Sequence, residues 1–132
     1  MFEEADFQYV NNGDILISAC PVLMEETPRD VLWGYYLCIE NNSDRKIQLV
    51  GKSWNITDDQ GNFYADDSAG FKGELPELEP GECFEFTSTA ALKAAHAVFY
   101  GSCKIVSDGC VREVKIPTFT MAAPRRRQRI LN

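Results

Sequence analysis

The residues best suited to binding chemistry lie in the stretch DDSAGFKGELPELEPGE, which spans positions 66–82. Glycine-spaced loops bind phosphate because bare backbone N–H groups converge on the anion, most strongly where a helix N-terminus lies behind them. The candidate ligand-binding residues in this stretch are Ser68, Gly70, Lys72 and Gly73. We consider the hypothesis that these four residues bind phosphate or pyrophosphate.

Three features of the same stretch favour a loop that only connects two strands. The sequence E-L-P that follows Gly73 does not begin a helix, and the Walker spacing G-x-x-x-x-G-K-[ST] is absent. Lys72 is outnumbered by Asp66, Asp67 and Glu74, whose charges repel an anion. Judged from the residues alone, phosphate binding is therefore the alternative and a structural loop is the first interpretation.

Residues for catalysis or metal binding are scarce. The chain has one histidine, His96, so a multi-histidine metal site is excluded, and no motif supports a Cys103–His96 nucleophile pair. The acid pairs 58–59 and 66–67 lack the spacing of a calcium loop, and we interpret them as solvated turn residues. Asp66 and Asp67 are the only candidate bases beside the loop. We expect no catalytic residue, no metal site and no cofactor, and thus no enzyme.

The elements that must position the loop are predicted to be strands. Short alternating segments bounded by turn residues recur throughout, and we expect strands at 14–19, 31–40, 46–57, 63–65, 83–88, 98–106, 110–117 and 118–121. In the second, alternation places Val31, Trp33, Tyr35, Leu37 and Ile39 on the core face. A change of alternation around Gly51 predicts a bulge. The pattern predicts an all-β, antiparallel two-sheet sandwich.

Three connections complete this prediction. Pro21 is expected to end the first strand, since proline has no backbone N–H to donate to the neighbouring strand. The polar residues 24–30 are expected to form a loop. The Ala-rich stretch 89–97 is expected to form a helical turn or two. Ser107-Asp108-Gly109 predicts a hairpin in which Val106 faces Cys110.

The five cysteines are odd in number and form no C-x-x-C pair, which indicates buried free thiols and no disulfide framework. In the predicted hairpin register Cys103 faces Glu113, which disfavours a Cys103–Cys110 disulfide.

Charge divides the chain into a domain, residues 1–124, and a basic tail, residues 125–132. Arginines at 125, 126, 127 and 129 are four of the 13 basic residues, so residues 1–124 carry nine basic against 20 acidic residues, a net charge of −11. Such a domain is ill suited to nucleic acid. The tail is interpreted as a solvated end, with an acidic partner or RNA as the alternative. No apolar run approaches a membrane span and no signal peptide is recognised, so we expect no membrane insertion and a cytoplasmic location.

The order of several short motifs resembles that of the ApaG family over residues 31–121. The motifs are Y-x-x-x-I-x-N-x-S-D at 35–44, QLVGKSWNITDDQGN at 48–62, G-x-x-G-x-x-P-x-L-x-P-G-E at 70–82, F-x-F-T-S at 84–88 and KIPTFTM at 115–121. The resemblance implies a fibronectin type III-like, immunoglobulin-like β-sandwich. It also implies a bacterial, cytoplasmic protein linked to cobalt resistance and magnesium efflux, in a family where related domains act as protein-interaction modules.

The resemblance also implies a pyrophosphate-binding role for the glycine loop, from which this chain departs. Ser68 takes the position of the first family glycine, and Lys52 stands where the family usually has arginine before Trp54. His96, Tyr100 and Ser102 replace family glycines and a tyrosine in 96–102. We therefore interpret the chain as a divergent member.

Two functions follow as expectations. The first is a non-enzymatic binding or interaction module, with a protein partner or self-association through an exposed edge strand. The alternative is a binder of pyrophosphate or dinucleoside polyphosphates through residues 68–73.

Overall fold

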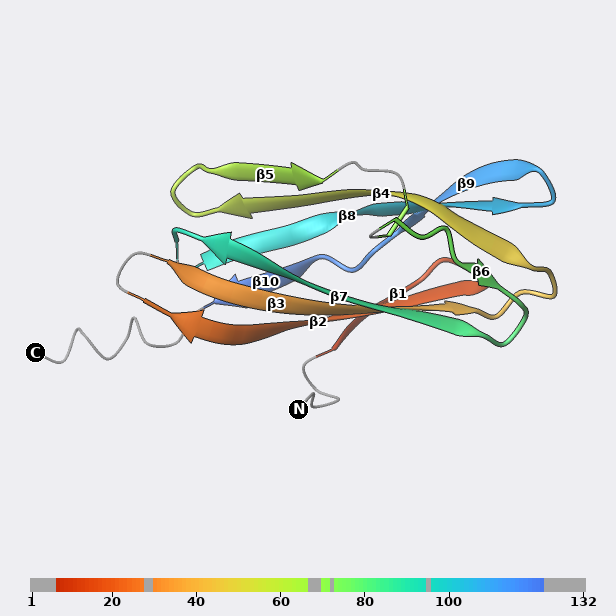
Figure 1. Cartoon of the computed structure of the whole chain (residues 1–132), viewed down its shortest axis with the longest axis horizontal. Coiled ribbons are helices and arrows are strands. Elements are labelled where there is room, and N and C mark those ends of the chain that lie inside the picture. The colour runs from red at the N-terminus through yellow and green to blue at the C-terminus, as the bar shows by residue number, and fades with distance from the viewer. Residues whose placement is uncertain (1–6, 28–29, 67–69, 72, 95, 123–132) are drawn as a thin grey trace, which may run out of the picture.

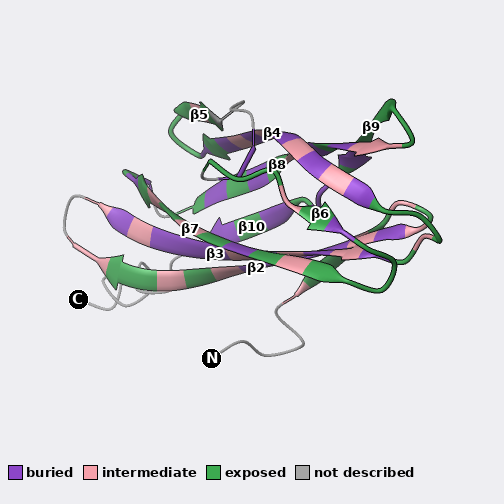
Figure 2. Cartoon of the chain, turned by 45° about the vertical axis from the view of Figure 1, so that its right-hand side comes forward, coloured by how far each residue is buried: buried purple, intermediate pink, exposed green. Residues whose placement is uncertain are grey.

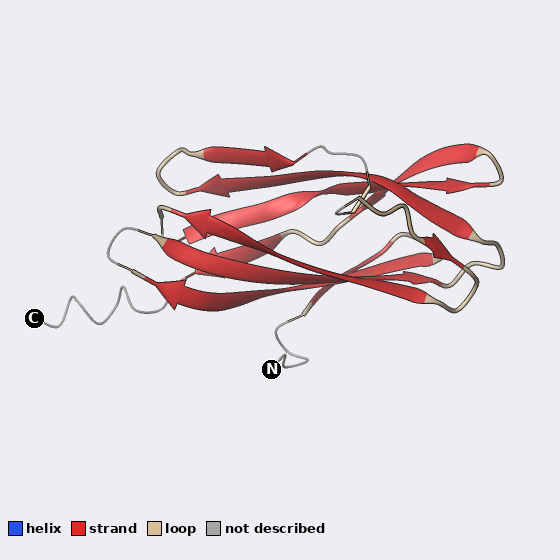
Figure 3. Cartoon of the chain, viewed as in Figure 1, coloured by secondary structure: helices blue, strands red, loops and turns tan. Residues whose placement is uncertain are grey.

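The computed structural model describes residues 7–27, 30–66, 70–71, 73–94 and 96–122, and these residues form strands and turns with no helix (Figure 3). The strands are β1 Gln8–Asn11, β2 Ile15–Glu26, β3 Val31–Asn41, β4 Ile47–Asp58, β5 Phe63–Asp66, β6 Glu77–Leu78, β7 Cys83–Leu92, β8 His96–Ser107, β9 Cys110–Lys115 and β10 Phe119–Ala122. The described residues accordingly contain no helix that could cross a membrane.

Two antiparallel sheets form the sandwich. The first, sheet A, has the order β1-β2-β3-β7, and the second, sheet B, has the order β10-β8-β4-β5, with β6 paired to β4 and β9 to β8. Figure 1 shows the two layers, with sheet A below sheet B. The all-β, two-sheet sandwich that the strand pattern predicted is confirmed, and its sheet orders agree with the fibronectin type III-like arrangement that the family resemblance implied.

The core lies between the sheets and follows the predicted alternation. The five predicted core residues of β3 are buried, as are Ile15, Ile17 and Ala19 of β2. Sheet B contributes Leu49, Trp54 and Ile56 of β4 and Phe99, Cys103 and Ile105 of β8. Figure 2 shows the resulting stripes of buried residues along the strands of both sheets.

Two predictions about strand ends were wrong. β2 continues through Pro21 to Glu26 and pairs with β3 over that length, so residues 24–26 are strand and not loop. β1 pairs with β2 only as far as Ala19. From Pro21 onward, β2 is therefore hydrogen-bonded to a described strand on one side only. Proline, which has no backbone N–H to donate, is tolerated at such an edge.

The Ala-rich stretch is also strand and not helix. β7 extends to Leu92, which pairs with Val31, and β8 begins at His96. Sheet pairing has overridden the helix propensity of alanine. The bulge at Gly51 is confirmed, because the β4–β8 register shifts between Leu49 and Gly51.

The β8–β9 hairpin forms at the predicted turn with a register one residue from the prediction. Ser107 faces Cys110, Val106 faces Val111, and Cys103 faces Val114. The two-residue turn takes positive φ at both Asp108 and Gly109. All five cysteines are free thiols, as predicted, although only Cys20 and Cys103 are buried.

Candidate functional site

The predicted phosphate loop links β5 to β6, both strands of sheet B, and is only partly described. Ser68 and Lys72 lie outside the described residues, as does Asp67, so their places in the site stay predictions. Gly70 precedes, and Gly73 lies within, a tight turn in which Phe71 and Glu74 form a β-bridge. Both glycines have positive φ, 74° and 85°.

The loop inserts an aromatic side chain into the core. Phe71 is 1% exposed, and its ring centroid lies 5.8 Å from that of Trp54 and 5.4 Å from that of Phe86. Such tilted ring pairs contribute stability beyond the area they bury. The loop is thus anchored between β4 and β7. Sequence reasoning missed this anchor, although an aromatic residue between two glycines was the available signal.

Three backbone donors in the described part of the loop are engaged. Gly70 N donates to Val50 O at 3.0 Å, Phe71 N to Glu74 O at 2.8 Å, and Glu74 N to Phe71 O at 3.1 Å. A phosphate-binding loop needs such N–H groups directed at the anion. These three donors point instead into the turn and toward β4.

Lys52 lies beneath the loop and was not among the predicted site residues. Its side chain is buried, and Nζ donates a hydrogen bond to Gly70 O at 2.9 Å. Nζ also lies 5.6 Å from the centroid of the Trp54 ring and 5.4 Å from that of Phe71, within the range of cation–π attraction. Lys52 thus ties the loop to β4 and is the cation nearest to Gly70 among the described residues.

The acid pair at 58–59 has two different roles. Asp58 is buried and its carboxylate accepts hydrogen bonds from Gln60 N, Asn62 N and Asn62 Nδ2 at 2.8–3.0 Å. Burial alone would raise the pKa of Asp58, but the hydrogen bonds from Asn62 and Gln60 together hold the pKa below its usual value. The expectation of a solvated turn acid was wrong for Asp58, which shapes the β4–β5 turn.

Asp59 is exposed, and its carboxylate lies 3.5 Å from Nδ1 of His96. The sequence had given this histidine no partner. Among the described residues, no group of three or more His, Cys, Asp or Glu side chains could hold a metal ion.

A groove opens where the edge strands β7 and β5 face each other. Its volume is about 200 Å³; its floor includes Trp54 and Phe99, and its sides include Tyr64 and Ala65 of β5 and Ser88–Ala90 of β7. β7 pairs with β3 and, among the described residues, with no strand on its other side. An open strand edge therefore runs beside an aromatic-floored groove.

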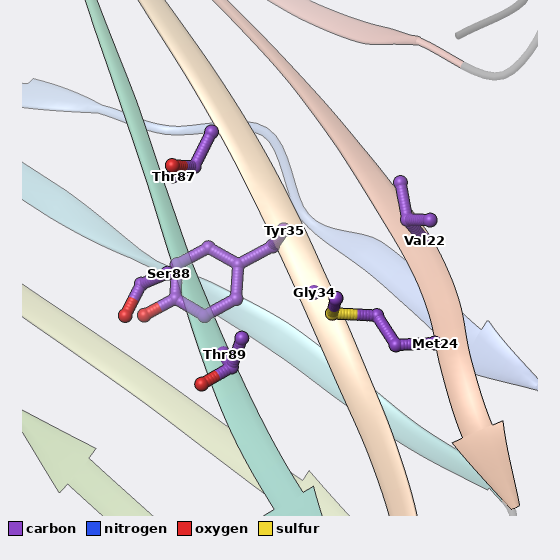
Figure 4. A pocket seen from close by; sticks show the side chains of 7 residues that line it. All are labelled: Val22, Met24, Gly34, Tyr35, Thr87, Ser88 and Thr89. Atoms are coloured by element: carbon purple, nitrogen blue, oxygen red, sulfur yellow. The ribbon is translucent and has the colours of Figure 1, made fainter. Parts of the chain in front are cut away.

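A second hollow, of about 340 Å³, lies on the outer face of sheet A around Gly34. Val22 and Met24 of β2 stand on one side of it and Thr87 and Thr89 of β7 on the other (Figure 4). The hollow exists because the central strand carries no side chain there: a Cβ on Gly34 would lie 2.8 Å from the sulfur of Met24. The predicted alternation of the strand at 31–40 places Gly34 on the face opposite the core. A glycine on that outer face was the sequence signal for this hollow.

Farther along the same face, Tyr36 donates a hydrogen bond to Glu85 at 2.8 Å. Burial is the main cause of the raised pKa of the Tyr36 phenol, and the hydrogen bond to Glu85 adds to it. The pKa of the Cys38 thiol is raised to about 12, mainly by burial and further by Cys83. Neither group is ionised near neutral pH, so this patch offers no thiolate at Cys38.

Comparison with known proteins places this geometry in a family. Residues 22–107 match the ApaG domain family. The chain is 35% identical over 119 residues to Protein ApaG of Beijerinckia indica, covering 89% of this chain and 91% of that one. It is 37% identical over 102 residues to Protein ApaG of Rhodospirillum centenum, covering 76% and 78%.

Solved structures agree. The crystal structure of the putative ApaA protein from Bordetella pertussis superimposes with a TM-score of 0.80 at 29% identity, covering 89% of this chain and 96% of that chain. A structural-genomics target superimposes with a TM-score of 0.80 at 26% identity, covering 87% and 91%. The motif order, the sandwich and these matches agree, and the chain belongs to the ApaG domain family.

Proposed function

We propose that this protein is a non-enzymatic interaction module that binds an extended segment of a partner protein along the open edge of β7. The observation that carries the proposal is the groove between β7 and β5 at Ser88–Ala90. An added strand obtains main-chain hydrogen bonds from the edge, and its alternate side chains obtain a pocket from the aromatic floor. A second copy of this chain is one form that such a partner takes.

A matched pair of variants on β7 tests this proposal. Ser88 and Ala90 are half-buried on the groove side, whereas Ala91 is exposed on the other face. Peptides selected from a displayed library against the wild-type protein should lose affinity at least tenfold for Ala90→Arg and keep it for Ala91→Arg. Hydrogen exchange of the complex should show new protection at 88–91.

Two results would contradict the proposal. One is protection confined to other strands, and the other is equal binding by the two arginine variants at unchanged urea midpoints. Light scattering over a range of protein concentrations tests the self-association form, for which Ala90→Arg should give a smaller mass than the wild type.

The family resemblance connects such modules with cobalt resistance and magnesium efflux, and we propose that this chain acts there through the protein it binds. In a host that lacks the gene, Ala91→Arg should restore growth on cobalt and Ala90→Arg should not. If both variants restore growth on cobalt, cobalt resistance does not depend on binding at the β7 edge.

The alternative, binding of pyrophosphate or a dinucleoside polyphosphate at residues 68–73, has less support because three backbone donors of the loop are engaged. Titration calorimetry with pyrophosphate tests it directly. Heat in the wild type that is lost in Lys72→Ala would favour this function over the interaction module.

A further inference from the structure

The strands of sheet A carry charge of one sign. β1, β2, β3 and β7 contain acidic residues and no lysine or arginine, whereas the basic residues of the strands all belong to β4, β8 and β9 of sheet B. Glu25 pairs with Leu32 and Glu85 with Cys38, and both of these β3 residues alternate with the core residues and so face outward. Glu40 of β3 lies on the same face. The outer face of sheet A is therefore acidic.

The hollow around Gly34 lies between two of these acids. Along β3, Gly34 is two residues from Leu32, which pairs with Glu25, and four residues from Cys38, which pairs with Glu85. A strand rises about 3.4 Å per residue, so the two acids lie about 7 Å and about 14 Å from Gly34 along the strand, in opposite directions. The hollow is thus flanked by a carboxylate at each end.

The rim of the hollow exposes apolar side chains. Val22 and Met24 are 37% and 57% exposed, and both stand beside it (Figure 4). Thr87 and Thr89 border it from β7. An aliphatic side chain placed over Gly34 would be removed from water between these two walls, and the flexible methionine can adapt to its shape.

Backbone pairing decides which kind of segment this face can hold. Around Gly34, β3 is paired with β2 on one side and with β7 on the other. Its N–H and C=O groups are directed within the sheet, so a segment that lies on the face cannot extend the ladder. Such a segment has to satisfy its own backbone groups, as an α-helix does. Helices pack on the faces of sheets in many layered folds.

We propose that the outer face of sheet A binds an amphipathic, basic α-helix of a partner protein. One aliphatic side chain of the helix fills the hollow over Gly34, and lysines or arginines before and after it lie against Glu25 and Glu85. At a rise of about 5.4 Å per turn, these basic residues are about one turn and about two and a half turns from the aliphatic residue. Opposite charge selects the partner, and burial of apolar surface holds it.

This surface is distinct from the open edge of β7. The edge is proposed to bind an extended segment beside Ser88–Ala90, whereas the outer face binds a helix, so one proposal can fail while the other holds. Ala90→Arg, which blocks the groove between β7 and β5, should leave helix binding unchanged.

Methionine methyl resonances offer a direct test, because the chain has only three methionines. Met24 borders the hollow, Met121 is fully buried and serves as the reference for the fold, and Met24→Leu assigns the signal. The probe is a synthetic helix of about 18 residues, about 27 Å long, with leucines on one face and lysines on the other. In the full-length protein labelled with ¹³C-methyl methionine, we expect the probe to shift Met24 and to leave Met121 in place.

Matched controls separate this contact from general attraction between a basic peptide and an acidic protein. A scrambled peptide of the same composition, which has no apolar face, should bind at least tenfold more weakly. Glu25→Lys should weaken binding of the helix at least tenfold, whereas Glu113→Lys makes the same change of charge on sheet B and should weaken it less than twofold. Gly34→Ala, which adds a methyl group to the floor of the hollow, should weaken binding at least fivefold at an unchanged urea midpoint.

Four results would overturn the proposal. The first is a Met24 resonance that the helix does not shift, and the second is equal loss of binding in Glu25→Lys and Glu113→Lys. The third is a Met24 position that changes with protein concentration before any peptide is added, which would assign the hollow to a second copy. The fourth is a Met24 position that changes, again without peptide, when residues 1–6 or 123–132 are removed, which would assign the hollow to the chain's own end.

Discussion

Gly70 and Gly73 share a left-handed backbone but differ in their surroundings. A Cβ on Gly70 would lie 2.7 Å from Glu74 O, whereas a Cβ on Gly73 would meet nothing within 4 Å. Gly73→Ala should therefore cost only the backbone strain, about 1 kcal/mol. Gly70→Ala adds a contact with main chain that cannot easily move, and we expect a loss of roughly 2–3 kcal/mol. Urea unfolding at neutral pH measures both, and equal losses would contradict this assignment.

Lys52 is the residue whose role changed most between sequence and structure. The sequence marked Lys52 only as a replacement of the family's usual arginine, but the structure shows a residue that is 8% exposed and whose ammonium donates to Gly70 O. Lys52→Met keeps the aliphatic stem and leaves that carbonyl without its donor, so we expect a loss of about 1–3 kcal/mol in the free energy of unfolding.

Lys52→Arg is the control for this prediction, because it preserves the positive charge and the donor groups. It should retain more stability than Lys52→Met in the same urea titration. A Lys52→Met protein as stable as the wild type would show that the ammonium is dispensable for holding the loop.

Among the turns, the one between β4 and β5 carries a pH dependence. The folded-state pKa of Asp58 lies below that of the unfolded chain, so its carboxylate contributes stability above about pH 4. That contribution is lost as the pH falls through the folded-state pKa. Asp58→Asn should lower the urea midpoint at pH 7 and make it less sensitive to acid. Glu25→Gln, at an exposed site, should keep the acid sensitivity of the wild type.

The strands themselves were largely predictable, and their ends were not. Alternation identified the core face of β3 because each strand there buries one side chain in two. Pro21 gave a wrong strand end because the effect of a proline depends on the neighbours of its strand, and β1 pairs with β2 only as far as Ala19. Alanine-rich residues 89–92 misled because pairing with β3 decides their conformation.

The site was less predictable than the fold, for reasons that belong to the whole molecule. The importance of Phe71 depends on Trp54, Phe84 and Phe86, which come from two different sheets. The hollow over Gly34 depends on β2 and β7, which are brought together by β3. The local sequence identified the glycines. Only the tertiary arrangement shows that Gly70 and Gly73 shape a turn, whereas Gly34 leaves a hollow on the surface.

Across the whole molecule, thiol reactivity should report how tightly the sandwich closes. Cys83 and Cys110 are exposed, Cys20 and Cys103 are buried, and Cys38 is half-buried. Burial also raises the pKa of Cys103 to about 12, so neither Cys103 nor Cys38 supplies much thiolate at neutral pH. Ellman's reagent should therefore find two fast thiols in the native protein and five in denaturant.

The Cys83→Ser/Cys110→Ser double variant should abolish the fast phase and leave three thiols that react on unfolding. A fast phase that persists in this variant would mean that the sheets open on the timescale of the reaction.

The hollow over Gly34 depends on the absence of a single side chain. A glycine codon becomes an alanine codon by one nucleotide change, and the atom that this adds would press against the flexible side chain of Met24 and leave the backbone clear. This protein can thus close or reopen this surface in one mutational step while keeping its sandwich. Relatives that do not use this surface should accumulate that change, which makes position 34 a marker of whether the surface is in use.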